Sequence, residues 1–454
     1  MDIRKFKELV FAAGRSAGLE EMEIYAARTK ELEVRVYKSE VDNYNLSDEG
    51  GVGLRARYAG KIGYAYTEAL DDQSVEYLVN AVKANAQVID SEDEIEFFAG
   101  SLSYPEVETY YPELDQVPAE EYINAALEFE RTAQSADSRV DSVNWALTGY
   151  FSSDVFIANT EGLEQSFRQN LAYGFVSAVI RENGQVKTGS KSKSIYDWAQ
   201  FDPAAMAREA VEEGLSLLNA ETVPSGNYRI ILRRDAARSI LATFSGVFSA
   251  EAVQKGLSLL GDKLGTQIAA ETVSLVDNPF VPHAGGSRPF DGEGVAVQKT
   301  DVIAKGQLNS FLHNLKTAKK QGVQSTGNAS RPSFKSTVGI APTNFYIEPG
   351  EDSYNALLTQ LGDGLVIIDV QGLHSGANPV SGDFSLGAYG YRVENGKVVG
   401  AVDQITISGN FFTLLRDVEK VGSDLEFGLP GGAGNVGSPS LLIRGLSVAG
   451  RRGK

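Results

Sequence analysis

The segment from Gly372 to Phe384 constrains the fold of this chain more than any other part of the sequence. It contains three glycines, one proline, two serines, one asparagine and one aspartate. Glycine adopts backbone angles that other residues avoid, proline fixes φ and donates no hydrogen bond, and Asn and Asp tolerate left-handed turns. This mixture predicts an irregular polar loop, since neither a regular helix nor a plain buried strand accommodates it.

Two interpretations of this loop follow from its residues. Residues 384–393 are typical of a strand, so the loop is either a glycine-bulged corner of a β-rich domain or a surface whose backbone groups bind a peptide-like ligand. In the first interpretation, Ser381 and Asp383 cap the turn. In the second, the candidate peptide-binding residues are four in the loop and one elsewhere in the chain: His374, Asn378, Ser381, Asp383 and His313.

Periodicity along the chain predicts an α+β fold with two similar N-terminal modules, which we assign to residues 1–95 and 96–222. Alternating apolar and polar residues mark strands with one buried face, and apolar stripes mark helices. The first module is expected to contain helix 3–17, strands near 32–37 and 52–58, and helix 72–89. The second is expected to repeat this order with a helix after Pro118, strands near 142–157 and 171–190, and a helix at about 203–219. Asn183-Gly184 predicts a hairpin turn within 171–190.

Residues 223–454 are predicted to form a β-rich C-terminal domain. A strand at 228–233 precedes Asp235, a candidate helix N-cap, and residues 236–263 are expected to be helical with a break near Ser245. Glycine-punctuated strands follow from about residue 270, with an Asn-Gly hairpin turn at 395–396.

Charge excludes two classes of partner. The net charge is −18 and the isoelectric point is near 4.8, so nucleic-acid phosphates and anionic membranes are repelled. Eleven acidic residues and no Lys or Arg lie between residues 90 and 121, which predicts a solvated connector at the start of the second module. The basic tail 451–454 is expected to be a loose end. The chain contains no cysteine, which excludes disulfides and thiolate metal sites and fits a cytoplasmic protein.

Several separated motifs resemble one known family. GLHSGANPVSGDFSLGAYGY, which starts at Gly372, is followed by ENGKVVGAVDQITISGNFFTLLRDVEKVGSDLEF and GSPSLLIRGLSVAG, and earlier segments at 255–265 and 291–294 belong to the same pattern. Together they resemble the TldD/PmbA proteins, a bacterial and archaeal family associated with a zinc-dependent peptidase. The resemblance is strong in the last half of the chain and extends to the general layout of the first half.

The catalytic motif of the peptidase branch is missing from this sequence. In that branch, the helix before a Lys-Gly-x-Ser segment carries a His-Glu-x-x-x-His motif. Its two histidines bind zinc, its glutamate activates the zinc-bound water, and a cysteine near the C-terminus helps to bind the metal. Counting back from Lys255, the two histidine positions hold Leu241 and Gly246, and the glutamate position holds Ala242. Leu and Ala can neither coordinate zinc nor accept a proton. The resemblance therefore implies no catalytic or metal-ligating residue and no cofactor in this chain.

The resemblance to the PmbA (TldE) branch implies a non-catalytic subunit. Such a subunit pairs with a TldD-type subunit that holds the zinc, and the complex cleaves peptides or unfolded proteins. Alone, the chain is expected to form a homodimer through an extensive interface. One alternative is a homodimeric peptide-binding or scaffolding protein without a protease partner. Another is an independent hydrolase that uses an unrecognised site. Ser381 as nucleophile would need His374 as base, and the loop spacing alone does not establish that geometry.

Two further patterns carry less weight. The three histidines, His283, His313 and His374, have no partner at helical spacing and predict ordinary core or surface roles. Residues 432–437 match G-x-G-x-x-G, but a strand-like run follows where a phosphate-binding loop requires a helix. The sequence therefore predicts no nucleotide site.

Overall fold

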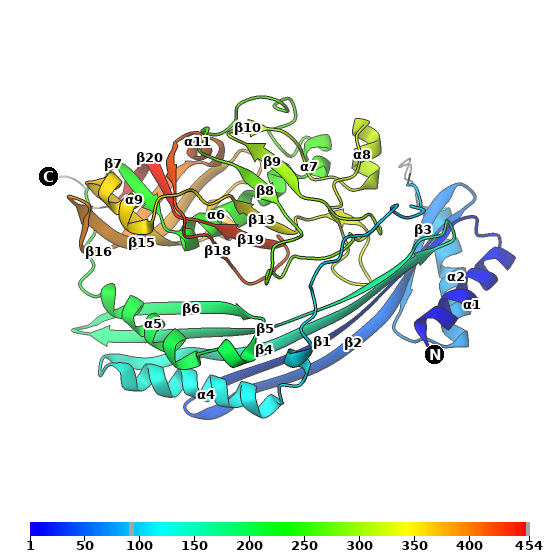
Figure 1. Cartoon of the computed structure of the whole chain (residues 1–454), viewed down its shortest axis with the longest axis horizontal. Helices are drawn as coiled ribbons and strands as arrows, with labels where there is room; N and C mark the ends of the chain where they lie inside the picture. The colour runs from blue at the N-terminus through cyan, green and yellow to red at the C-terminus, as the bar shows by residue number, and fades with distance from the viewer. Residues whose placement is uncertain (90–94, 451–454) are drawn as a thin grey trace.

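The computed structural model describes residues 1–89 and 95–450 and has an α+β fold, as predicted (Figure 1). A long six-stranded sheet carries helices on one face, and the β-rich C-terminal domain lies against the other. Within the described residues, no helix combines the length and apolar composition needed to cross a bilayer. The predictions for the acidic residues 90–94 and the basic tail 451–454 fall outside the described residues.

The N-terminal half contains the helices and strands that the periodicity predicts. In chain order they are α1 (Ile3–Ser16), β1 (Met22–Tyr37), β2 (Glu40–Tyr58), β3 (Lys61–Thr67), α2 (Asp72–Val88), α3 (Pro112–Asp115), α4 (Ala119–Ala136), β4 (Val140–Asn159), β5 (Glu164–Glu182), β6 (Gln185–Ile195), the 3₁₀ turn η1 (Trp198–Gln200) and α5 (Pro203–Ser216). The hairpin predicted at Asn183-Gly184 joins β5 to β6, and both residues have positive φ, 49° and 80°.

The two modules share one antiparallel sheet with the order β3-β2-β1-β4-β5-β6. Its centre is the pairing of β1 with β4, from Glu23 opposite Asn159 to Val36 opposite Ala146. Each module therefore contributes a three-strand meander, and their first strands meet in the middle. The division between residues 1–95 and 96–222 stays a prediction, and the sheet continues across it.

Side-chain alternation gives this sheet two apolar faces. One face packs beneath the helices, with Ile24 and Leu54 under α1 and α2, and Val34 and Val176 under α4 and α5. The opposite face contacts the C-terminal domain through a separate cluster, which contains Tyr25, Val155, Ile157, Leu163, Phe290 and Phe334. Burial on both faces fixes the register, because a slip of one residue would exchange them.

A glycine in the last strand of each module lets a helix lie directly on the sheet. A Cβ atom on Gly63 of β3 would stand 2.0 Å from the carbonyl oxygen of Val82 in α2. A Cβ atom on Gly189 of β6 would stand 1.9 Å from the carbonyl oxygen of Ala210 in α5. No side chain fits at either position. The same close approach of a helix backbone to a strand glycine therefore occurs in both modules.

The C-terminal domain is rich in short strands. Its elements are β7 (Gly226–Leu232), α6 (Arg234–Phe244), η2 (Ser245–Phe248), α7 (Ala250–Gln254), β8 (Leu275–Asp277), β9 (Thr300–Ala304), β10 (Gln307–Leu308), α8 (Leu315–Gln321), β11 (Ala329–Ser330), β12 (Gly339–Ile340), β13 (Asn344–Ile347), α9 (Tyr354–Leu361), β14 (Gly364–Gln371), α10 (Leu373–Gly376), β15 (Asp383–Glu394), β16 (Lys397–Asn410), α11 (Phe411–Arg416), β17 (Val418–Val421), β18 (Glu426–Phe427), β19 (Asn435–Ser438) and β20 (Leu441–Ala449). The hairpin predicted at 395–396 joins β15 to β16.

Two six-stranded sheets surround helix α6 in this domain. One has the order β10-β9-β8-β13-β19-β18, and the other has the order β16-β15-β14-β7-β20-β17. A further pairing of β16 with β20 closes five strands of the second sheet on themselves. Helix α6 contacts β14 of one sheet and β19 of the other, so its apolar side chains lie in the domain core.

The helix predicted over 236–263 is shorter than expected. Helix α6 ends at Phe244, η2 and α7 follow, and residues 255–265 form turns in which Gly256 and Gly265 have positive φ. Asp235 does not cap α6, because the N-cap position is Arg233. The carboxylate of Asp235 instead accepts a hydrogen bond from Arg233 Nε at 2.6 Å.

The connector is less solvated than its acidity predicts. Phe97 and Tyr111 are buried, and the hydroxyl of Tyr104 donates to the carbonyl oxygen of Gly294 at 2.8 Å. Its described part therefore packs between the N-terminal sheet and the C-terminal domain.

A buried ion cluster joins the sheet to the C-terminal domain. Arg55 on β2 donates from Nε to Glu23 Oε1 at 2.8 Å and from Nη2 to Oε2 at 3.3 Å. Arg331 of the C-terminal domain donates to the same carboxylate, and Arg55 Nη1 lies 3.6 Å from Glu293 Oε1. All four residues are at most 7% exposed. Burial alone would raise the pKa of Glu23, but the guanidinium groups of Arg55 and Arg331 outweigh it and lower that pKa.

We predict that Arg331→Ala destabilises the protein by about 3–5 kcal/mol, because it leaves a buried carboxylate short of a partner. The measurement is the free energy of urea unfolding of the full chain. Arg28→Ala is the control, since Arg28 pairs with Asp48 on the exposed surface and exposed pairs contribute little. Equal losses in the two variants would contradict the prediction.

Candidate functional site

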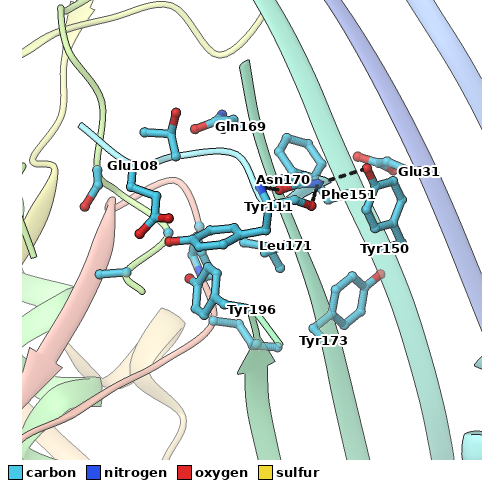
Figure 2. A pocket seen from close by; sticks show the side chains of 17 residues that line it. Glu31, Glu108, Tyr111, Tyr150, Phe151, Gln169, Asn170, Leu171, Tyr173 and Tyr196 are labelled. Carbon is cyan, nitrogen blue, oxygen red and sulfur yellow. Dashed lines mark hydrogen bonds between the residues drawn. The ribbon is translucent and has the colours of Figure 1, made fainter. Parts of the chain in front are cut away.

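A cavity of about 420 Å³ lies where the N-terminal sheet meets the C-terminal domain (Figure 2). Strands β1, β4 and β5 form one wall, the connector forms the second, and Tyr196, directly after β6, completes it together with two C-terminal loops. The lining residues are Glu31, Glu108, Thr109, Tyr111, Tyr150, Phe151, Gln169, Asn170, Leu171, Tyr173, Tyr196, Ala284, Gly285, Ser287, Leu429, Pro430 and Gly431. They come from segments that are far apart in the chain.

The position of Tyr173 depends on a glycine in the neighbouring strand. Gly149 of β4 is opposite Tyr173 of β5, and a Cβ atom there would stand 2.2 Å from the tyrosine ring. The ring therefore lies across β4, and its hydroxyl is 3.5 Å from Glu33 Oε2 on β1. Burial, with Glu33 and then Glu31 nearby, raises the pKa of Tyr173 to about 12. The phenol stays neutral near pH 7.

Two aromatic residues of the opposite wall are held by hydrogen bonds and stacking. Asn170 Nδ2 donates to the carbonyl oxygen of Tyr111 at 2.9 Å, and the Tyr111 N–H donates to Asn170 Oδ1 at 2.7 Å. The rings of Tyr111 and Tyr196 are 5.1 Å apart, and His283 stacks on Tyr196 at 5.5 Å. Burial also raises the pKa of Tyr111 to about 12. These contacts form a rigid, neutral aromatic surface.

The cavity combines this aromatic surface with carboxylates. Glu31 and Glu108 line it, and its lining contains no Lys, Arg or His. The hydroxyl of Ser287 is engaged, because it donates to the carbonyl oxygen of Val281 at 2.8 Å. Such a surface can bind a chain through apolar and hydrogen-bonding contacts, and it offers no evident nucleophile–base pair.

The family zinc positions do not fit a zinc ion. Leu241 of α6 is 2% exposed and packs in the C-terminal core with Ile240 and Phe244. Ala242 packs against the same core, and Gly246 lies in η2 without a side chain. Over residues 1–89 and 95–450, no three His, Cys, Asp or Glu residues are grouped so that they could hold a metal ion.

The predicted peptide-binding residues lie apart from the cavity. His313 is 2% exposed, and its Nδ1 is 3.2 Å from Thr317 Oγ1. Burial lowers the pKa of His313 to about 4, so the ring is neutral near pH 7. His374, Asn378, Ser381 and Asp383 belong to the 372–384 loop, of which no residue lines the cavity. A peptide-binding role for these five residues stays a prediction.

Hydrogen bonds within the loop favour its architectural interpretation. Asn378 Oδ1 accepts from the N–H groups of Val380 and Ser381, and Asn410 Nδ2 donates to Asp383 Oδ1 at 2.9 Å. Asn410 in turn caps α11. The hydrogen bonds from Asn410 and then Ser381 lower the pKa of Asp383.

The tyrosine-lined cavity is not predicted from the sequence. The chain has 19 tyrosines, and alternation along the second module places several on a strand face, which is a usable signal. The pairing of β1 with β4 and the approach of residues 284–287 and 429–431 are tertiary features that no local pattern encodes.

Comparison with family models matches nearly the whole described chain. The matching models are PmbA/TldA metallopeptidase domain 1 over residues 22–86, the central domain over 112–218, and the C-terminal domain over 225–450.

Individual relatives span the full length. The metalloprotease PmbA homolog of Haemophilus influenzae is 27% identical over 452 residues, covering 98% of this chain and 94% of that protein. A Thermotoga maritima crystal structure, described as a candidate modulator of a DNA gyrase, is 34% identical with a TM-score of 0.91 and covers 99% of this chain and 100% of its own. TldE from Thermococcus kodakarensis, 22% identical, shares the fold with a TM-score of 0.89 and covers 98% and 100% of the two chains.

We predict that the purified chain binds no stoichiometric zinc, because apolar residues and glycine occupy the family ligand positions. Elemental analysis of protein prepared without chelator measures this. The prediction fails if each chain holds one tightly bound zinc that is lost on substitution of any of the three histidines.

We also predict that Asp383→Ala lowers the melting temperature by about 1–2 °C, because Asn410, which caps α11, loses one of the two acceptors of its Nδ2 group and keeps the carbonyl oxygen of Ser381. Asp383→Asn keeps an Oδ1 acceptor and serves as the matched control, with a smaller change expected. An unchanged melting temperature together with weaker peptide binding would instead assign the loop to ligand binding.

Proposed function

The chain belongs to the PmbA/TldA metallopeptidase family, and we propose that it acts there as a non-catalytic subunit. In this proposal it pairs with a TldD-type subunit that holds the zinc, and the complex cleaves peptides or unfolded proteins. The chain itself binds no cofactor. We place the complex in the cytoplasm, consistent with a sequence that lacks cysteine.

This proposal rests on the side chains at the three family zinc-motif positions, which cannot bind zinc or act as a base. A zinc peptidase needs ligands that present nitrogen, sulfur or oxygen, and a base that activates the bound water. Here Leu241 is part of the apolar core, and Ala242 and Gly246 present no such atom. The rest of the family fold is retained around these positions, which supports a role that depends on the fold and not on chemistry at α6.

The aromatic cavity supports a role in holding substrate. It is lined by backbone-rich loops and by tyrosines, which combine apolar area with hydrogen-bonding groups. An extended peptide passing between the sheet and the C-terminal domain would meet this surface. A subunit that holds the chain in place raises the effective concentration of the scissile bond at the partner's zinc.

One observation also supports a second candidate function, peptide binding without a protease partner. The cavity is built within a single chain, so peptide binding needs no zinc-bearing partner. The alternative is therefore a homodimeric peptide-binding or scaffolding protein. The two candidates differ in whether a TldD-type subunit changes the assembly and confers cleavage.

We predict that co-expression with a TldD-type subunit from the same genome, one with His-Glu-x-x-x-His and a late cysteine, yields a stable heterodimer that cleaves unfolded peptides. Alone, the chain should form a homodimer without activity. Size-exclusion chromatography with light scattering measures assembly, and a fluorogenic peptide assay measures cleavage.

The matched control is a partner with its His-Glu-x-x-x-His glutamate changed to Gln, which should pair and not cleave. Activity of the present chain alone, abolished by Ser381→Ala, would overturn the non-catalytic assignment. Persistence of the homodimer in the presence of the partner would favour the scaffolding alternative.

A further inference from the structure

We infer that the aromatic cavity selects peptide segments in which an apolar or aromatic side chain is flanked by Lys or Arg. This inference rests on the proposed role of the cavity in holding substrate and names the class of substrate.

The charged groups at the cavity are all acidic. Glu31 lines it from β1, Glu108 lines it from the connector, and Glu33 reaches Tyr173 at its edge. Figure 2 shows Glu31 and Glu108 on opposite sides of the tyrosine cluster. A cation bound on either side of an inserted ring would therefore meet a carboxylate.

These carboxylates have no cation of their own among the described residues. The ion pairs of the sheet engage other acids, such as Asp48 with Arg28 and Asp154 with Arg168, and none engages Glu31, Glu33 or Glu108. A single carboxylate without an ion-pair partner is common on a protein surface. Three of them around one concave surface produce a negative potential there. Repulsion of acidic segments then contributes to specificity as much as attraction of basic ones.

The aromatic surface fits the uncharged part of such a segment. Tyr111, Tyr173 and Tyr196 present ring faces and edges, and Tyr111 and Tyr196 are already held in a T-shaped pair with centroids 5.1 Å apart. An aromatic side chain gains edge-to-face contacts with such rings, and a flanking Lys or Arg can also lie over a tyrosine face. A volume of about 420 Å³ is within the range of small-ligand pockets and admits one or two side chains.

The test compares three fluorescein-labelled peptides by fluorescence anisotropy with the full-length wild-type chain. The first carries Lys-Phe-Lys in a Gly/Ala background, the second Glu-Phe-Glu, and the third Lys-Gly-Lys. We expect the first to bind at least about tenfold more tightly than either other peptide. Raising the salt from about 0.05 M to about 0.5 M should reduce the preference over Glu-Phe-Glu, because screening weakens it.

The variant that tests the assignment is Glu31→Gln with Glu33→Gln and Glu108→Gln. These changes keep side-chain shape, and we expect them to remove most of the preference for Lys-Phe-Lys over Glu-Phe-Glu. The matched control is Glu121→Gln on α4, an exposed acid on the helix-covered face of the sheet, which should leave that preference unchanged.

The outcomes separate this inference from the proposed function. Equal binding of Lys-Phe-Lys and Glu-Phe-Glu by the wild-type chain, or a preference that survives the triple substitution, overturns the inference and leaves peptide binding intact. Absence of binding by all three peptides, both to the chain alone and to its complex with an inactive TldD-type partner, overturns the substrate-holding role itself.

Discussion

The buried carboxylate of Glu23 is the constraint on which the arrangement of this protein depends. It accepts hydrogen bonds from Arg55 of the N-terminal sheet and from Arg331 of the C-terminal domain, and both arginine side chains are almost fully excluded from solvent. A buried charge tolerates few geometries, because an unpaired one is far more costly than a pair. The cluster therefore fixes how the C-terminal domain lies on the sheet. Since the aromatic cavity is formed by the same two surfaces, its shape depends on this contact as well.

Local pattern predicted most of the elements and little of their assembly. Period-two alternation identified β1, β2, β4 and β5, and Asn-Gly turns identified two hairpins, because these signals depend on neighbouring residues. The joining of both modules through β1 and β4 depends on pairing across more than a hundred residues. The helix predicted over 236–263 does not extend through residues 255–265, where Gly256 and Gly265 have positive φ. The acidity of the connector predicted a solvated segment, but the buried side chains of Phe97 and Tyr111 determine how it packs.

The same contrast applies to the site. The replacement of the family zinc ligands was visible in the sequence, since it needs only the identity of Leu241, Ala242 and Gly246. The cavity was not, because Glu31, Tyr173 and Pro430 meet only in the folded chain. In α6, Leu241 and Ala242 pack in the core of the C-terminal domain, and the aromatic cavity lies away from them, against the N-terminal sheet. In the proposed function, this chain contributes binding and enclosure to a reaction whose chemistry belongs to its partner.

Hydrogen–deuterium exchange of the complex with a TldD-type subunit tests this account most directly. The partner should carry a Gln at its catalytic glutamate, so that a bound peptide is not cleaved. The account predicts that peptide addition slows amide exchange in this chain around residues 108–111, 169–173 and 429–431, with no change in α6. Peptide-induced protection that is absent from these segments, or confined to α6 and η2, would contradict it.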